Sequence, residues 1–251
     1  MNKLLILLFV LLCSGANADT RKHTLKITKD KHEYIEVSDS DNFSMSNVEK
    51  KVRQASVKVS RFDGGHGSGS IIDYKGMHLV LTAQHVASDD IGTLYYVENN
   101  TESLLGVLIY ADEMNDFALL YLPTKFIEGK PMKYSPLDTV LEVGKQVLYS
   151  AYPSEHQLLS FRGRVAGYES LKGRGTQIIL HTYGWFGCSG SVIYDPKGNI
   201  VGVLWGIDME HYPETQAIED IIWVSPIKNF NIQESLSVIC DVIEENSKAC
   251  R

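Results

Sequence analysis

Residues 187–191, GCSGS, place two possible nucleophiles next to each other, the thiol of Cys188 and the hydroxyl of Ser189. A nucleophile that attacks an amide needs a base to take its proton, a group that orients the base, and hydrogen-bond donors for the developing oxyanion. The segment is rich in small residues, so the backbone amides of Gly187 and Ser189 can converge on one point as such donors. The segment alone leaves open whether Cys188, Ser189 or neither residue does chemistry.

Two other segments contain the remaining side chains that this chemistry needs. LVLTAQHVASDD places His85 at the end of an apolar run, where a strand edge can present an imidazole as a base. EMNDFALLYL places Asp116 directly before another apolar run, where a carboxylate can orient that base. Each residue also has a simpler interpretation, because a histidine after a strand is usually structural and an aspartate before a strand often only forms a turn. The order His85, Asp116, Ser189, each beside a predicted strand, favours a catalytic set.

Short β-branched and aromatic runs predict the strands that hold these side chains. They recur from ASVKVSRF to AIEDIIWVS, many alternate in polarity, and most are bounded by Gly, Asp, Asn, Pro or Lys. Regularly spaced short strands are typical of an all-β barrel or sandwich and not of a parallel α/β sheet. Residues 123–144, which contain three prolines, separate the strands into two groups, as two barrels joined by a linker would require.

The sequence predicts one helix on each side of the strands. SNVEKKVRQA begins with Ser46, a good helix cap, and predicts a short N-terminal helix. Near the C-terminus the apolar residues fall on one side of a helix, which predicts a helix packed on the outside of the fold through Ile232, Leu236, Ile239 and Ile243.

Residues 1–18 are typical of a secretory signal peptide, with a basic start, an apolar run too short to span a bilayer and a small-x-small triplet that predicts cleavage after Ala18. A lipid anchor at Cys13 is disfavoured because bulky Leu12 precedes it. We therefore expect export to a periplasmic or extracellular location with no stable membrane anchor after cleavage. Residues 19–45 are polar and predict an extension, and whether it is a removed pro-segment stays open.

Composition limits the possible partners. A formal net charge of −7 argues against nucleic acid, which is bound through clustered Lys and Arg. No pattern suggests a cofactor or a metal ion, and the sequence leaves the oligomeric state open.

After cleavage the cysteines are Cys188, Cys240 and Cys250, an odd number. Cys240 and Cys250 can form a disulfide or remain two thiols, since sequence alone does not fix connectivity.

Six motifs occur in the order found in one known family. They are SVKV with GSGSIID, LTAQHVA, NDFALLYL, LEVGKQVLYSAYP with GRVAG, GCSGS, and GNIVGVLWG. On these motifs the chain resembles a trypsin-like serine protease of the chymotrypsin fold, similar in style to HtrA, trypsin-2-type and glutamyl endopeptidase domains. Residues 46 to about 228 carry the resemblance.

The resemblance implies a fold and a domain arrangement. We expect two six-stranded antiparallel β-barrels, at about residues 46–130 and 140–228, in a protease domain that spans residues 46–230. A C-terminal helical tail follows at residues 231–251. Because nothing after residue 230 is long enough for the PDZ domain of extended HtrA chains, regulation through such a domain is not expected.

The resemblance also assigns roles to the candidate residues. It implies Ser189 as the nucleophile, His85 as the general base and acid, Asp116 as the group that orients His85, and the amides of Gly187 and Ser189 as the oxyanion hole. Cys188 then becomes a packing residue, because a nucleophile at that position would be followed by Ser189 where a glycine is expected. Cys188 also stands where trypsin-type zymogens carry an aspartate, so their activation latch is not expected.

Substrate specificity follows less directly from the resemblance. It implies Tyr183 at the base of the primary pocket, with Leu204, Trp205 and Gly206 along its wall. Tyr183 carries no charge, so a preference for Arg or Lys has no support. Ser191 replaces the second glycine of the motif, as in glutamyl endopeptidases.

The resulting expectation is a serine endopeptidase that hydrolyses protein or peptide substrates through an acyl-enzyme intermediate. The alternative is a catalytically inactive homologue that binds peptides or proteins in the same groove. The complete set of His85, Asp116 and Ser189 argues against the alternative, because inactive homologues often lack one of the three.

Overall fold

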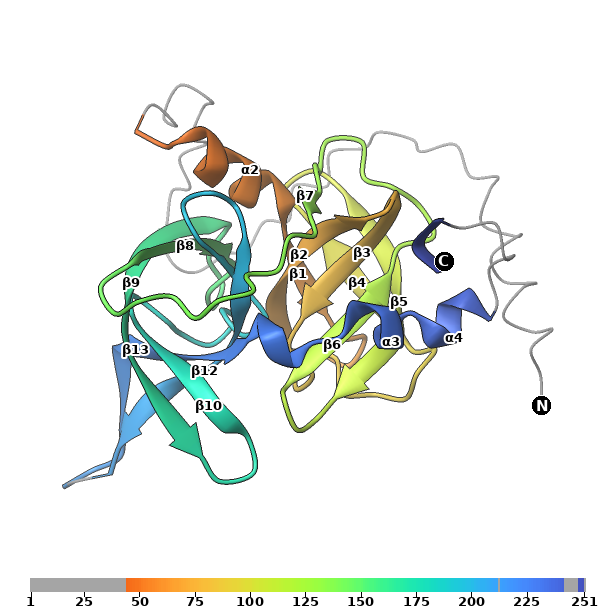
Figure 1. Ribbon diagram of the computed structural model, residues 1–251. Coiled ribbons are helices and arrows are strands. Elements are labelled where there is room, and N and C mark those ends of the chain that lie inside the picture. The colour runs from red at the N-terminus through yellow and green to blue at the C-terminus, as the bar shows by residue number, and fades with distance from the viewer. Residues whose placement is uncertain (1–43, 212, 242–247, 251) are drawn as a thin grey trace, which may run out of the picture. The chain divides into compact units, whose positions relative to one another are not determined.

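The strands of the protein close into two β-barrels that lie side by side (Figure 1). The structure, a computed structural model, describes residues 44–211, 213–241 and 248–250. The predicted signal peptide at residues 1–18 and nearly all of the predicted extension at residues 19–45 lie outside the described residues. The expectation of an all-β fold with two six-stranded antiparallel barrels is confirmed.

The first barrel contains six antiparallel strands in the order β1-β4-β5-β6-β3-β2, and pairing of β1 with β2 closes it. A short strand, β7, pairs in parallel with β2 at Ile72 and Asp73, beyond the part of β2 that pairs with β1. Apolar and polar residues alternate along β1, as a strand with one buried face requires. Val57 and Val59 are buried in the core, and Lys58 between them is only partly buried. The strands are β1 Ser56–Ser60, β2 His66–Tyr74, β3 Met77–Thr82, β4 Leu94–Glu98, β5 Ser103–Asp112, β6 Phe117–Tyr121 and β7 Met132–Lys133.

The second barrel is also closed, in the order β10-β13-β12-β11-β8-β9. Its interior is filled by apolar and aromatic side chains that include Val147, Tyr149, Leu180 and Ile222. The long hairpin of β12 and β13 extends beyond the barrel and provides one edge of the cavity described below. The strands are β8 Gln146–Ala151, β9 Leu159–Leu171, β10 Gly175–His181, β11 Val192–Tyr194, β12 Ile200–Glu210 and β13 Gln216–Pro226.

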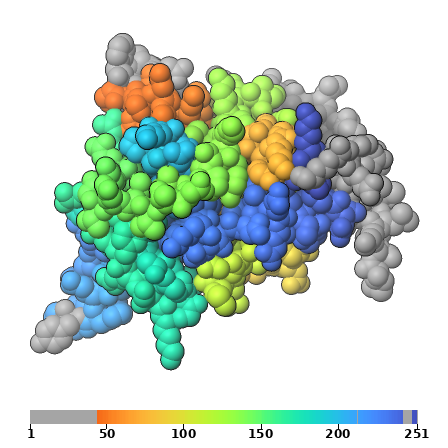
Figure 2. Space-filling model, viewed as in Figure 1, coloured from red at the N-terminus to blue at the C-terminus, as the bar shows by residue number. Residues whose placement is uncertain are grey.

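The helices lie outside the barrels, as predicted. Helix α2 (Asn47–Ala55) begins with a capping box in which the Ser46 hydroxyl accepts from the Glu49 amide and the Glu49 carboxylate accepts from the Ser46 amide. Figure 2 shows the C-terminal segment, in blue, lying across the face of the molecule. It contains η2 (Ile227–Asn229), α3 (Ile232–Ser235), α4 (Ser237–Cys240) and η3 (Lys248–Cys250).

The predicted C-terminal helix is divided into α3 and α4 at Leu236, which ends the first and precedes the second. The predicted apolar side is correct for the described positions, because Ile232, Leu236 and Ile239 all join the core of the first barrel. Ile243 lies outside the described residues. Cys240 and Cys250 form a disulfide, which decides between the two alternatives left open by the sequence. In the described part of the chain, no helix is long and apolar enough to cross a membrane.

Candidate active site

His85 and Asp116 meet at one end of the first barrel. His85 lies in the turn after β3, and Asp116 lies in the turn that enters β6. The His85 Nδ1 atom is 2.8 Å from Asp116 Oδ2, and the His85 amide donates to Asp116 Oδ1 over 2.9 Å. One carboxylate therefore fixes both the ring and the backbone of the histidine. The backbone of Asp116 adopts φ 57°, an uncommon value for a residue with a side chain, and these bonds offset its cost.

The electrostatics of this pair favour an ionised carboxylate. Burial of Asp116, whose side chain is only 2% exposed, by itself raises the pKa of its carboxyl group. The hydrogen bonds from the His85 ring and amide and the nearby charge of Arg174 outweigh burial, so the pKa of Asp116 lies below its usual value. An ionised carboxylate only accepts hydrogen bonds, so His85 Nδ1 carries the proton and Nε2 is left to act as a base.

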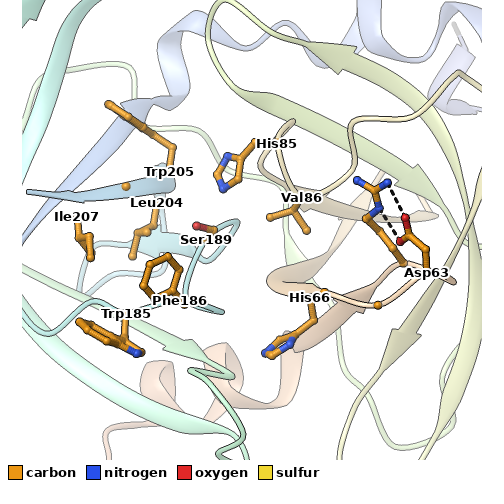
Figure 3. Close-up of a pocket in the computed structure, with 14 residues that line it drawn as sticks. Asp63, His66, His85, Val86, Trp185, Phe186, Ser189, Leu204, Trp205 and Ile207 are labelled. Atoms are coloured by element: carbon orange, nitrogen blue, oxygen red, sulfur yellow. Dashed lines mark hydrogen bonds and ion pairs between the residues drawn. The ribbon is translucent and has the colours of Figure 1, made fainter. Parts of the chain in front are cut away.

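Ser189 shares a cavity with His85. The cavity has a volume of about 630 Å³ and lies between the two barrels. Figure 3 shows the His85 ring and the Ser189 side chain facing the same space. Among the described residues no hydrogen bond joins the Ser189 hydroxyl to the His85 ring, and such bonds often tighten only when substrate binds. His85 and Asp116 thus come from the first barrel, and the Ser189 hydroxyl comes from the second.

The 187–191 turn contains two backbone amides whose hydrogen bonds are not used within the protein in the described part of the chain. Gly187 has φ 91° and Gly190 has φ 88°, and these values favour glycine. The Cys188 amide donates to the Trp185 carbonyl, the Gly190 amide to the Leu204 carbonyl, and the Ser191 amide to the Cys188 carbonyl. The amides of Gly187 and Ser189 donate to no acceptor in the described part of the chain, so both are available to an oxyanion.

Contacts from outside the turn hold it in this shape. The Ser154 amide donates to the Phe186 carbonyl over 2.7 Å, which fixes the peptide that carries the Gly187 amide. The Ser68 hydroxyl, on β2 of the first barrel, donates to the Gly187 carbonyl over 2.7 Å, and the Ser68 amide donates to the Ser189 carbonyl over 2.7 Å. The orientation of the donors therefore depends on both barrels.

Residues 67–203 match the family model of the trypsin-like peptidase domain, a segment that includes His85, Asp116 and Ser189. The chain belongs to this family. It is a serine-type endopeptidase by that membership. Solved structures similar to this trypsin-like peptidase include the active form of the Rv3671c protease from M. tuberculosis, with 17% identity, 77% of this chain and 84% of that chain covered, and a TM-score of 0.61.

The inactive form of the same M. tuberculosis protease is 17% identical, with 78% of this chain and 93% of that chain covered and a TM-score of 0.59. At this identity the likeness shows the fold alone. A comparison with curated proteins finds no match.

Cys188 of this trypsin-like peptidase lies in the core of the second barrel, fully buried. Burial raises the pKa of its thiol to about 11. Because the thiolate is the nucleophilic form of cysteine, this environment keeps Cys188 inert near neutral pH. The placement agrees with the packing role that the resemblance implies.

The cavity lining includes three of the four residues predicted to bind substrate. Leu204, Trp205 and Gly206, on β12, line the cavity together with the adjacent Ile207. Tyr183 is not among the lining residues, because its ring stacks on Phe161 at a centroid distance of 5.3 Å and its carbonyl accepts from the Tyr149 hydroxyl. The predicted position of Tyr183 at the base of the pocket is therefore not observed.

Sequence reasoning missed other residues of the site. Trp185 and Phe186 line the cavity just before the 187–191 turn, and two adjacent aromatic residues before the motif are the signal that could have indicated them. Arg174 contacts the Asp116 carboxylate from the second barrel, and no local pattern indicates this contact. The described residues contain no group of three or more His, Cys, Asp or Glu side chains that could hold a metal ion.

Proposed function

We propose that the protein is an exported serine endopeptidase in which His85, Asp116 and Ser189 form a catalytic triad and the amides of Gly187 and Ser189 form the oxyanion hole. The observation that supports this most strongly is that His85, which is bonded to the buried Asp116, lines the same cavity as Ser189. The second support is that the amides of Gly187 and Ser189 donate to no acceptor among the residues that the structure describes.

In this mechanism His85 Nε2 takes the proton from Ser189 Oγ as that oxygen attacks the scissile carbonyl carbon. The oxyanion that forms accepts hydrogen bonds from the amides of Gly187 and Ser189, and Asp116 stabilises the imidazolium. The imidazolium gives its proton to the leaving amine, and the acyl-enzyme remains. Water then attacks the acyl carbon with His85 again acting as base, which releases the acid and regenerates Ser189.

The second barrel suggests which side chains the cavity accepts. Its contribution to the lining consists of uncharged residues, among them Trp185, Leu204 and Ile207. An apolar wall binds apolar side chains by excluding water and leaves a cation without a partner. We therefore expect cleavage after apolar residues and little cleavage after Arg or Lys.

Export is supported by the sequence of residues 1–18 and by the disulfide between Cys240 and Cys250. Disulfides persist in oxidising compartments and are rare in the cytosol. Protein recovered from outside the cytosol is expected to begin at Asp19, which N-terminal sequencing measures.

A fluorophosphonate probe tests the proposed nucleophile. We expect the folded protein to be labelled, Ser189→Ala to lose all labelling, and Ser191→Ala to retain it. Ser191 is the matched control because it lies in the same turn but is fully buried. No labelling of the wild-type protein would favour the catalytically inactive homologue, and labelling that survives Ser189→Ala would place the nucleophile elsewhere.

A further inference from the structure

A positive charge from the second barrel reaches the buried carboxylate of the first. Arg174 lies in the turn between β9 and β10, and its Nη1 atom is 3.6 Å from Asp116 Oδ2. That oxygen also accepts the hydrogen bond from the His85 ring. The Asp116 side chain is 2% exposed and the Arg174 side chain 33% exposed, so solvent screens this contact only in part.

The guanidinium of Arg174 is held by the wall of the cavity. Its Cζ atom lies 4.6 Å from the centroid of the Trp205 ring, in the position of a cation–π contact. The fully buried Gln177 side chain donates to the Arg174 carbonyl over 2.7 Å and accepts from the Trp205 indole nitrogen over 3.0 Å. One amide side chain therefore fixes both the turn that carries Arg174 and the ring on which its guanidinium rests.

The Nη1 atom of Arg174 is buried and has no hydrogen-bond partner among the described residues. Its 3.6 Å separation from Asp116 exceeds the usual length of a hydrogen bond, so the contact is one between charges. Leaving a charged donor unpaired is costly, and the polar group that it faces is the carboxylate of the proposed triad. The groups facing the Asp116 carboxylate are His85 and Arg174, and those facing the guanidinium are Asp116 and Trp205.

We propose that Arg174 is a positioning residue, which holds the Asp116 carboxylate from the second barrel and thereby links the Trp205 wall to the His85–Asp116 pair. The proposal rests on the proposed function. A positive charge at this place opposes binding of a proton by the pair. Removing the charge lets the pair take up a proton at higher pH, and a protonated pair cannot activate Ser189.

The test measures the rate of fluorophosphonate labelling against pH for the full mature chain. Arg174→Gln removes the charge and keeps a polar side chain, and we expect the acid midpoint to rise by about one pH unit, with the maximal rate about tenfold lower. Arg174→Lys keeps the charge, and its midpoint is expected to stay near that of the wild type even if its rate falls. Lys172→Gln is the matched control, since it removes an exposed charge from the same turn.

An unchanged midpoint in Arg174→Gln, equal to that of Lys172→Gln, would overturn the proposal. A fall in rate without a shift of the midpoint would show that Arg174 only stabilises the turn, which also overturns it. If the wild-type protein is not labelled at all, the proposed function fails, and the NMR signal of the His85 Nδ1 proton still tests Arg174. Its titration midpoint is expected to rise in Arg174→Gln and not in Arg174→Lys, and equal midpoints in all three proteins would refute the positioning role.

Discussion

Replacing Ser68 by alanine would remove the side chain through which the first barrel holds the 187–191 turn. The Ser68 hydroxyl is fully buried, donates to the Gly187 carbonyl over 2.7 Å and accepts from the Tyr152 amide over 3.0 Å. Alanine leaves both backbone groups without this partner. Each buried group that loses its partner costs about 1–3 kcal/mol, so for two groups the free energy of unfolding is expected to fall by about 2–6 kcal/mol.

The same substitution is expected to slow catalysis, because the peptide that follows Gly187 loses its anchor and the proposed oxyanion donors become less well aligned. Complete loss of one oxyanion donor typically lowers kcat by about 10²–10³. Since Ser68→Ala loosens the turn and removes no donor, a decrease of about tenfold is expected. Urea unfolding measures the stability change, and hydrolysis of a peptide with an apolar residue before the cleaved bond measures kcat.

Ser70→Ala is the matched control for Ser68→Ala. Ser70 lies on the same strand and is equally buried, but its hydroxyl bonds the Tyr194 hydroxyl over 2.7 Å and does not touch the turn. We expect Ser70→Ala to reduce stability and leave kcat close to that of the wild type. Equal kcat values for the two variants would refute the conclusion that Ser68 orients the oxyanion donors.

Three further predictions concern stability and reactivity. Gly190→Ala is expected to prevent folding at ordinary yield, measured by circular dichroism, because φ is 88° and a Cβ atom would lie 2.1 Å from the Ser68 carbonyl oxygen. The hydrogen bond from Arg162 lowers the pKa of Glu49 to about 2, so its contribution to stability is present above about pH 4.3 and is lost as the pH falls towards 2. Glu49→Gln should therefore flatten the urea-unfolding stability between pH 5 and pH 2. Because burial raises the pKa of Cys188 to about 11, iodoacetamide at pH 8 should modify this thiol only after unfolding, as mass spectrometry would detect.

The barrels could be predicted from the sequence because strand formation here follows local patterns. The alternation of apolar and polar residues in a run such as β1, and the turn residues that separate one run from the next, can be recognised within a few consecutive residues. The division of the C-terminal helix at Leu236 could not be predicted, since the spacing of the buried residues Ile232, Leu236 and Ile239 is the same in one helix or two. The pairing of Cys240 with Cys250 likewise depends on the folded path of the chain.

The candidate site divides in the same way. His85, Asp116 and Ser189 each follow or precede an apolar strand, so their local context was enough to propose them as candidates. The resemblance implied Tyr183 at the base of the pocket, but the direction of its side chain depends on a stack with Phe161 that the motifs do not reveal. Arg174 approaches Asp116 only because a hairpin of one barrel reaches the other, and no motif records such a contact.

The contacts that align the site join the two barrels at separate points. Ser68 connects the first barrel to the oxyanion turn, and Arg174 connects the second barrel to the Asp116 carboxylate. Each contact therefore fixes a group that belongs to the other barrel. Ser189 lies close to His85 only because the two barrels are docked. The positive charge of Arg174 likewise reaches the Asp116 carboxylate only across the barrel interface. Neither barrel alone contains all three residues of the proposed triad, so the geometry of that triad depends on the docking of the barrels as much as on either fold.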